Sequence, residues 1–433
     1  MKRYTIYGIA IFLLLALLLS GCVQHKSITL TAKEVSLGKF HPGGVAASLV
    51  VSPDSKRMAY FAQKDGKQLV VIDGQEGREY DGIGEGSLIF SPDSKRVAYA
   101  AGKGGKMLVV VDGVEGSEYD GIGTTLIFSP DSKRVAYNAL KGKKQLVVVD
   151  GQECSVYDGI GEGDPIFSPD SKRVAYNALK GGKRLFVVDG VEGREYDRIG
   201  ALIFSPDSKR VAYIAVKGGK WLVVVDGQEG SEYDGIIEGA LIFSPDGKRV
   251  AYAAGKGEKR LVVVDSQEGR EYDGIIEGAL IFSLDGKRVA YAARKGEKQL
   301  VVVDGQEGSE YDGIGEGDPI FSPDSKRVAY GAQKGGKRLF VVDGQEGSEY
   351  DDIGAGSLIF SPDSKRVAYG AQKGETGKGE KWLVVVDGQE GSEYDGFLIG
   401  SKLVFDSSDS LHTLVYAGSS PEYFRLGIKI EEK

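Results

Sequence analysis

The chain contains little of what catalytic and metal-binding sites require. Its 433 residues include only three histidines and two cysteines. No two of His25, His41 and His412 share metal-ligand spacing, and the sequence has no zinc-binding pattern. The Gly-x-Ser-x-Gly turn of serine hydrolases is also missing. These absences predict a protein that is not an enzyme and that uses neither a metal nor a cofactor.

Helical periodicity is missing as well, once the N-terminal segment is passed. Glycine, by contrast, is abundant, and its 64 residues recur at fixed places, so they mark turns rather than disorder. Runs such as Gly82–Gly86 join two expected strands, which excludes a phosphate-binding loop before a helix. The net charge is −8, an acidic balance that argues against a nucleic-acid partner. The sequence therefore predicts an all-β protein.

The N-terminus has the order of an export signal. Lys2 and Arg3 precede an apolar run over residues 4–19, which is short for a membrane-spanning helix. The run ends in Leu19-Ser20-Gly21-Cys22, which resembles the lipobox of bacterial-type lipoproteins. The resemblance implies cleavage before Cys22 and a lipid anchor on its side chain, so that acyl chains attach the protein to a membrane. An ordinary signal peptide with a chance cysteine is the alternative.

The resemblance divides the chain into a lipoprotein signal peptide (1–21), a lipid-anchored segment with a candidate closing strand (22–40) and the repeats described below (41–433). Val23 is not the aspartate associated with inner-membrane retention. The resemblance thus implies the outer membrane, on its periplasmic side, if the cell has two membranes, and the outer face of the cell membrane otherwise. Cys154 stands where other repeats have Gly116 or Gly193, which we interpret as drift; a reactive thiol is the alternative.

One segment recurs along the rest of the chain. A typical copy is Leu88-Ile-Phe-Ser-Pro-Asp-Ser-Lys-Arg-Val-Ala-Tyr99, and successive copies are 37 to 39 residues apart. Their Ser-x-Asp cores begin at Ser52, Ser91, Ser129, Ser168, Ser205, Ser244, Ser283, Ser322 and Ser361. A degenerate tenth copy is Leu403-Val-Phe-Asp, followed by Leu414-Val-Tyr416, in which Tyr416 is expected to correspond to Tyr99. The sequence thus contains nine full units and a partial tenth.

Each unit is expected to form four short strands. In the second unit these are strand a (Leu88–Ser91), strand b (Arg96–Ala101), strand c (Met107–Asp112) and strand d (Ser117–Asp120). Strand c is apolar without alternation, as in a strand buried on both faces, whereas strand d is charged, as an exposed edge should be. Asp112-Gly113 predicts a tight hairpin turn. Small sheets of this kind suit the blades of a β-propeller.

The motif Phe-Ser-Pro-Asp-Ser/Gly-Lys-Arg-Val-Ala-Tyr resembles the WD40-like repeat, often called PD40, of TolB-type propellers. The resemblance covers nearly the whole chain after the N-terminal segment, with Leu284 in place of the turn proline as one departure. It implies a propeller fold and says little about function, and the count of units gives such a propeller about ten blades. We expect the stretch Ile28–Leu37 to add the missing outer strand of the last blade and close the ring. An open arc and two smaller rings are the alternatives.

Comparison of the repeats separates two faces. The a–b and c–d turns, here called the constant face, repeat Ser-Pro-Asp-Ser-Lys-Arg and Asp-Gly-Gln-Glu-Gly with little change. The b–c loops and d–a connectors, here called the variable face, differ between copies. Loops on a rigid scaffold are where binding sites usually lie, so any ligand site is expected on the variable face. Its recurring lysines are either an attraction for anionic ligands or ordinary solvated turn residues.

Candidate contact residues lie near the variable face. The first residue of the expected strand c varies between copies, and two tryptophans there are suited to stack on a sugar or to anchor a protein; packing against neighbouring blades is the alternative. The candidates are Trp221, Trp382, Lys143, Lys144, Arg184, Arg260 and Arg338.

These features predict a non-catalytic cell-envelope lipoprotein that acts as a propeller scaffold for protein–protein interaction. Its partners would be another envelope protein or an anionic glycan, together with the membrane through the lipid anchor. A carbohydrate- or cell-wall-binding propeller is an alternative, and a polysaccharide-active enzyme is another. A spacer without a specific ligand also fits the repeats.

Overall fold

The computed structural model describes residues 40–161, 165–237, 239–315, 319–354, 357–374, 379–398, 401–417 and 422–431. Almost all of their regular structure is β-strand, and the one helical element in these ranges is the short 3-10 turn η1 (Ala46–Ser48). Within the same ranges, no helix is long and apolar enough to cross a membrane. The signal peptide, Cys22 and the expected closing strand Ile28–Leu37 lie outside the described residues.

The described residues form ten antiparallel sheets, one for each predicted unit, and we number these blades one to ten in chain order. In the middle of each blade, strands b and c form a long hairpin. The b strands are β2 (Met58–Lys64), β7 (Val97–Lys103), β11 (Val135–Lys141), β16 (Val174–Lys180), β20 (Val211–Lys217), β25 (Val250–Lys256), β30 (Val289–Lys295), β35 (Val328–Lys334), β40 (Val367–Lys373) and β45 (Ser410–Ala417). The c strands are β3 (Lys67–Ile72), β8 (Lys106–Val111), β12 (Lys144–Val149), β17 (Lys183–Val188), β21 (Lys220–Val225), β26 (Lys259–Val264), β31 (Lys298–Val303), β36 (Lys337–Val342), β41 (Lys381–Val386) and β46 (Glu422–Lys429).

Strands a and d flank this hairpin. Strand a is one strand or a pair of short ones: β1 (Val50–Val51), β5 and β6 (Gly82–Ile83, Ile89–Phe90), β10 (Gly121–Phe128), β14 and β15 (Gly159–Ile160, Ile166–Phe167), β19 (Arg198–Phe204), β23 and β24 (Gly235–Ile236, Ile242–Phe243), β28 and β29 (Gly274–Ile275, Ile281–Phe282), β33 and β34 (Gly313–Ile314, Ile320–Phe321), β38 and β39 (Asp352–Ile353, Ile359–Phe360), and β43 and β44 (Gly396–Phe397, Val404–Ser407). The d strands are β4 (Gln75–Tyr80), β9 (Val114–Glu115), β13 (Gln152–Tyr157), β18 (Val191–Glu192), β22 (Gln228–Glu229), β27 (Gln267–Glu268), β32 (Gln306–Glu307), β37 (Gln345–Glu346) and β42 (Gln389–Tyr394).

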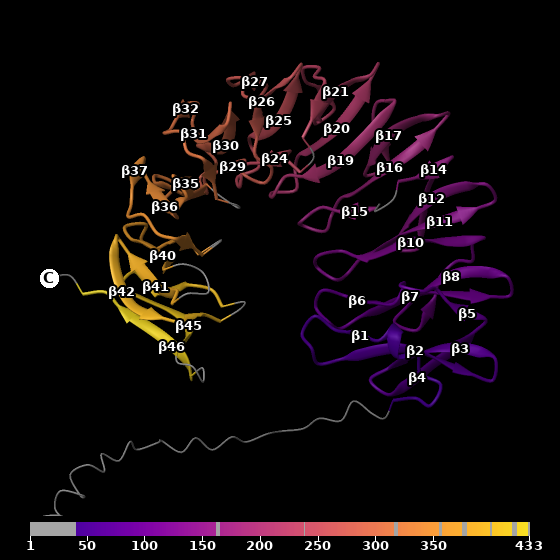
Figure 1. Ribbon diagram of the computed structural model, residues 1–433. Helices are drawn as coiled ribbons and strands as arrows, with labels where there is room; N and C mark the ends of the chain where they lie inside the picture. Colours follow the sequence, from indigo (N-terminus) through magenta and orange to yellow (C-terminus); the bar gives the residue numbers. More distant parts are fainter. Residues whose placement is uncertain are drawn as a thin grey trace, which may run out of the picture.

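The predicted fold class, an all-β propeller built from about ten four-stranded blades, is confirmed. The ten blades follow one another around an arc, with β24 and β29 toward its inside and β27 and β32 on its outside (Figure 1). Blades one and ten lie at the two ends of this arc, and no sheet combines strands from both among the described residues (Figure 1). Blade ten has strands a, b and c, and no fourth strand pairs with β46 within the same part of the chain.

Two of the predicted strand boundaries were wrong. Strand a begins earlier than Leu88, because Gly82 and Ile83 of the expected connector already pair with the end of strand b. Strand d begins directly after the c–d turn rather than at Ser117, and it rejoins the sheet only through a bridge between Met107 and Tyr119. Both strands are interrupted in the middle, and hydrophobicity alone does not reveal such an interruption.

The turns take the conformations that their residues favour. In the c–d turn, Asp112 and Gly113 have φ values of 50° and 80°, so both lie in the left-handed region that a tight hairpin turn requires. In the a–b turn, the Asp93 carboxylate accepts hydrogen bonds from Ser91 Oγ at 2.7 Å and from the Lys95 N–H at 3.1 Å. These bonds explain why the Ser-x-Asp sequence recurs in nine blades.

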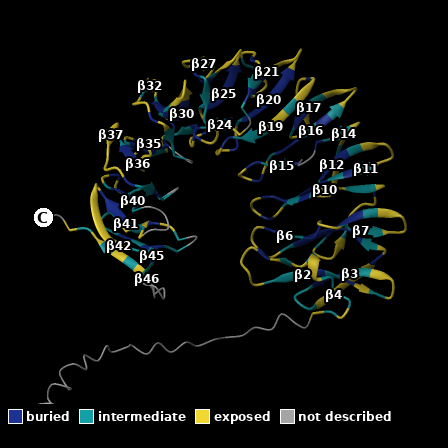
Figure 2. Ribbon diagram, viewed as in Figure 1, coloured by how far each residue is buried: buried dark blue, intermediate teal, exposed yellow. Residues whose placement is uncertain are grey.

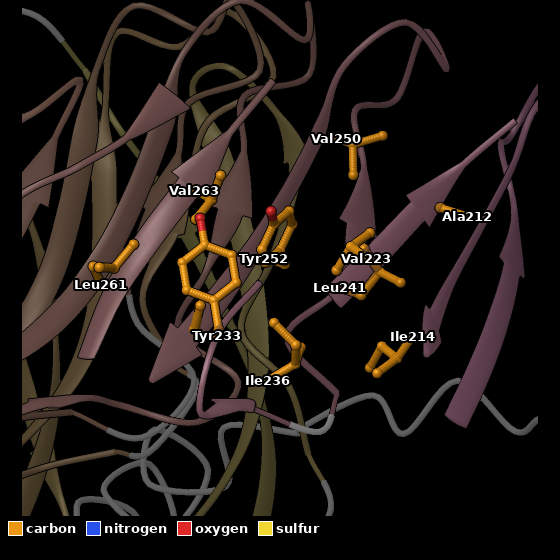
Figure 3. Packing of buried hydrophobic residues seen from close by; sticks show 11 residues of the cluster. Ala212, Ile214, Val223, Tyr233, Ile236, Leu241, Val250, Tyr252, Leu261 and Val263 are labelled. Carbon is orange, nitrogen blue, oxygen red and sulfur yellow. The ribbon is translucent and has the colours of Figure 1, made fainter. Parts of the chain in front are cut away.

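The apolar core lies between neighbouring blades rather than inside any one sheet. In blade six, Leu241, Tyr252 and Leu261 pack against Ile214 and Val223 of blade five (Figure 3). Burial is concentrated in strands b and c, whereas turns and outer edges are exposed (Figure 2). Each blade therefore depends on the next for its core, as in other repeat proteins.

The constant face fastens each blade to its neighbour. Arg96 forms an ion pair with Asp112 in its own blade, at 2.8 Å, and donates a hydrogen bond to the Lys133 carbonyl of the next blade, at 2.7 Å. Its guanidinium also lies 5.2 Å from the ring centre of Phe128, another residue of the next blade. The same set recurs in blades one and three to eight, so the recurring arginine is a structural connection between blades.

The register of blade ten differs from the prediction. In blade nine, Ile353 and Ile359 of strand a pair with Ala371 and Ala368 of strand b. In blade ten, the corresponding residues Phe397 and Val404 pair with Val415 and His412. Thr413, rather than Tyr416, therefore takes the place of the buried tyrosine of strand b. The prediction aligned the two tyrosines because the shorter a–b turn of blade ten hides the true spacing.

Candidate functional site

The lysines of the variable face have acidic partners. Lys103 lies 2.7 Å from Glu115, and Lys106 lies 2.5 Å from Asp120. Asp120 also accepts a hydrogen bond from the Gly142 N–H of the next blade, at 2.6 Å. The lysine and this N–H both lower the pKa of the Asp120 carboxyl. The positive charge that would attract an anionic ligand is thus partly neutralised, and anionic-glycan binding stays an untested prediction.

The predicted contact residues do not gather at one place, because they come from different blades. Lys144 pairs with Asp158, whereas Lys143 forms no ion pair with the described residues and is exposed. Arg184 donates to Asn177 Oδ1 at 3.2 Å, and Arg338 pairs with Asp352 at 2.9 Å. Arg260 donates to backbone carbonyls of its own b–c turn. For these residues a contact role stays a prediction.

The two tryptophans occupy the same position in strand c of different blades and have different surroundings. The Arg198 guanidinium lies 5.5 Å from the ring centre of Trp221, so that indole has a partner within the molecule. Trp382 instead meets Phe397 edge to face, with ring centres 5.7 Å apart, and both line a cavity. The structure therefore distinguishes Trp382 from Trp221, which sequence comparison did not.

This cavity, of about 680 Å³, lies between blades nine and ten. Its lining residues include Gly370 and Trp382 from blade nine and Phe397, Ser401, Lys402 and Thr413 from blade ten. Trp382 is next to the b–c loop and Phe397 follows the d–a connector, so the cavity is at the variable face. Three other clefts between blades have volumes of about 400, 480 and 410 Å³ and repeat the same lining of arginine, lysine, glutamate and tyrosine.

Two facing positions of the cavity wall carry small residues, and the second of them is specific to blade ten. Gly370 corresponds to Ile214 of blade five, and Thr413 corresponds to Tyr252 of blade six. The ring of Phe397 covers Gly370 so closely that a Cβ there would lie 2.8 Å from it. Sequence analysis missed this site because Thr413 was not recognised as the counterpart of the tyrosines; the pairing of strands identifies it.

Metal binding and a reactive thiol have little support in the described ranges. No group of three or more histidine, cysteine, aspartate or glutamate side chains there is arranged to hold a metal ion. Cys154 is half-buried between blades three and four, beside Tyr176, and burial raises the pKa of its thiol. A raised thiol pKa disfavours the thiolate, which is consistent with drift rather than with a reactive site.

Comparison with known proteins gives similar shapes only. No protein-family model and no curated protein matches the chain. A eukaryotic initiation factor structure is 14% identical and covers 78% of this chain and 96% of its own, with a TM-score of 0.37. TolB from Acinetobacter baumannii is 15% identical, covering 58% and 75%, with a TM-score of 0.25. The β-propeller domain of the Trilobed protease from Pyrococcus furiosus is 14% identical, covering 60% and 92%, with a TM-score of 0.27. Similarities this distant do not assign a function.

Proposed function

We propose that this chain is a lipid-anchored, non-catalytic protein of the cell envelope that serves as a scaffold for protein–protein interaction. The observation that carries the proposal is the difference between the two faces. The constant face consists of recurring side chains that are engaged in bonds from one blade to the next. The variable face has recurring bonds of this kind too, from the aspartate of strand d to the next blade, but also residues that do not recur. Side chains that differ between blades, and the cavity that they form, belong to the variable face. A partner that recognises this protein specifically would contact that face.

The environment of the acidic groups supports a non-catalytic role. Glu115, Glu229 and Glu346 of strand d each pair with a lysine of their own blade. Hydrogen bonds from these lysines lower the pKa of each carboxyl. A general acid needs a raised pKa and an environment that its counterparts do not share. These repeated ion pairs are therefore structural.

The membrane anchor is tested by replacing its cysteine. In a bacterial host, Cys22→Ser should abolish incorporation of a labelled fatty acid and release the protein from the membrane fraction, because the thiol is the acyl attachment point. Cys154→Ser is the matched control and should keep both the label and the membrane location. Fatty-acid labelling that survives Cys22→Ser would contradict the anchor.

The contact surface is tested by photo-cross-linking in intact envelopes. A photoreactive residue at Lys143, on the variable face, should give a discrete adduct with another envelope protein. The same residue at Lys133, an exposed position on the constant face of the same blade, is the control. Equal adduct patterns from the two positions, or no adduct from Lys143 and from equivalent b–c loop positions of the other blades, would contradict the proposed function.

A further inference from the structure

The cavity between blades nine and ten has walls suited to an aromatic side chain. Trp382 and Phe397 present two rings at nearly right angles, with an interplanar angle of 72°. Edge-to-face and offset contacts with such rings favour a third aromatic group over a flexible aliphatic chain. The volume of about 680 Å³ lies within the range of small-molecule sites, so an aromatic side chain enters with room for the residues that flank it.

The polar groups of the cavity disfavour a sugar. Ser357 Oγ donates to the Gly354 carbonyl at 2.6 Å and accepts from the Gly370 N–H at 3.1 Å. Ser401 Oγ donates to the Leu414 carbonyl at 3.3 Å. These two hydroxyls are already engaged, which leaves Thr413, Tyr416 and Lys402 as the other polar side chains of the lining. A ligand with many hydroxyl groups has more of them than these three could pair, and burying the rest is costly. An apolar ring has no such requirement.

One cation lies among the lining residues of the cavity. Lys402 is exposed and is the charged residue among those that line the cavity. Unlike the strand-end lysines of the other blades, it forms no ion pair with any described residue. An ammonium beside an apolar pocket, without an acidic partner in the described part of the chain, favours a ligand with a carboxylate next to its apolar part.

We propose that this cavity is an anchor site for a partner protein and that it receives an aromatic side chain flanked by acidic residues. The proposal rests on the proposed function, because it specifies how the scaffold holds its partner. Interfaces commonly derive most of their affinity from a few residues, often aromatic, that lie in well-packed desolvated pockets. Trp382 and Phe397 form the pocket, and Lys402 selects the acidic neighbours.

The test combines short peptides with variants whose substitutions come from other copies of the repeat. The probes are the acetylated tripeptide amides Glu-Phe-Glu, Glu-Ala-Glu and Lys-Phe-Lys, with methyl glucuronide as the saccharide probe, measured by ligand-observed NMR titration. Trp382→Gln removes an aromatic wall with a residue that blades one, three and seven carry at the same position, as Gln68, Gln145 and Gln299. Trp221→Gln is the matched control in blade five.

Glu-Phe-Glu should bind about tenfold more tightly than Glu-Ala-Glu, because the phenyl ring becomes buried. Trp382→Gln should reduce its affinity to that of Glu-Ala-Glu, whereas Trp221→Gln should leave it unchanged. Lys402→Gln should weaken Glu-Phe-Glu severalfold and remove its advantage over Lys-Phe-Lys. Circular dichroism melting of each variant verifies that the fold is retained.

Three results would overturn the proposal: equal affinity for the phenylalanine and alanine peptides, binding that survives Trp382→Gln, or tighter binding of methyl glucuronide than of Glu-Phe-Glu. The last result would identify a saccharide site. Cross-linking from Lys143 shows whether the anchor site alone is wrong or the proposed scaffold function is wrong as well. If the adduct persists in Trp382→Gln while no aromatic peptide binds, the scaffold has a partner that does not use this cavity.

Discussion

The interface between blades five and six and the interface between blades nine and ten have the same strand arrangement and different contents. In the first, Ile214 and Tyr252 are 3% and 4% exposed and help to fill the space between the sheets (Figure 3). In the second, Gly370 and Thr413 stand at these positions and a cavity remains. The strands of blade ten still pair as the others do. The fold thus tolerates a partly empty interface.

Blades six and ten also differ in the arginine with which a regular blade contacts the blade that follows it. Arg249 of blade six pairs with Asp265 and donates to the Lys287 carbonyl of blade seven at 2.5 Å. In blade ten the position of this arginine is taken by Ser410, whose counterpart in blade nine is Arg366. Blade ten therefore lacks the buried tyrosine and the connecting arginine of a regular blade. Substitutions at these two positions should lower the free energy of unfolding less in blade ten than in a regular blade.

The largest expected difference concerns the core tyrosine. Tyr252→Ala should lower the free energy of unfolding by about 3–5 kcal/mol, because it removes a buried ring from a close-packed interface. Thr413→Ala should cost less than about 1 kcal/mol, since it removes few atoms beside an existing cavity. Urea unfolding followed by circular dichroism measures both. Equal losses for the two variants would show that the interface between blades nine and ten is as tightly packed as the regular one.

A smaller difference is expected for the connecting arginine. Arg249→Ala should cost about 1–2 kcal/mol through the lost charged hydrogen bonds and the contact with Phe282, reduced by solvent because Arg249 is about a third exposed. Ser410→Ala should have almost no effect. Arg249→Lys is a second comparison, because lysine keeps the charge and loses the planar fork. Full stability of Arg249→Ala would contradict the structural role of this arginine.

The smallest expected effect depends on pH. The hydrogen bond from Ser244, with further bonds from Lys248, lowers the pKa of Asp246 to about 2. Because the folded-state pKa lies below the unfolded value of about 4, the stabilisation is complete above about pH 4 and is lost as the pH falls toward 2. The melting-temperature difference between the unmodified protein and Asp246→Asn should therefore shrink over that interval. A difference that stays constant from about pH 6 to about pH 2 would contradict this assignment.

The sequence predicted the repeated part of the molecule well, for a physical reason. Each regular unit meets the same neighbours, so Ser91, Asp93 and Arg96 recur wherever the turn and the contact between blades recur. The apolar strand c and the charged strand d follow from burial on two faces and exposure at an edge. Repetition within one chain thus gave information that a single unit would not contain.

The parts that escaped prediction are those where the repetition fails. The a–b turn before Ser410 is shorter than in the regular blades, so the spacing in blade ten suggested the wrong tyrosine. The cavity depends on the space that Thr413 leaves where regular blades have a tyrosine, and finding it requires knowing which residues face each other across two sheets. The ion pairs of the variable face likewise connect strand ends that the sequence separates by 12 to 14 residues.

The arginine that reaches from one blade to the next allows the number of blades to change by whole units. Each regular blade offers the same guanidinium on one side and the same backbone carbonyls on the other, so any two regular blades can adjoin. Insertion or deletion of a whole unit would keep these bonds and change only how far the arc extends. Blade number can therefore vary by duplication without new interfaces, while the exceptional last junction, with its own cavity, stays at the end of the series.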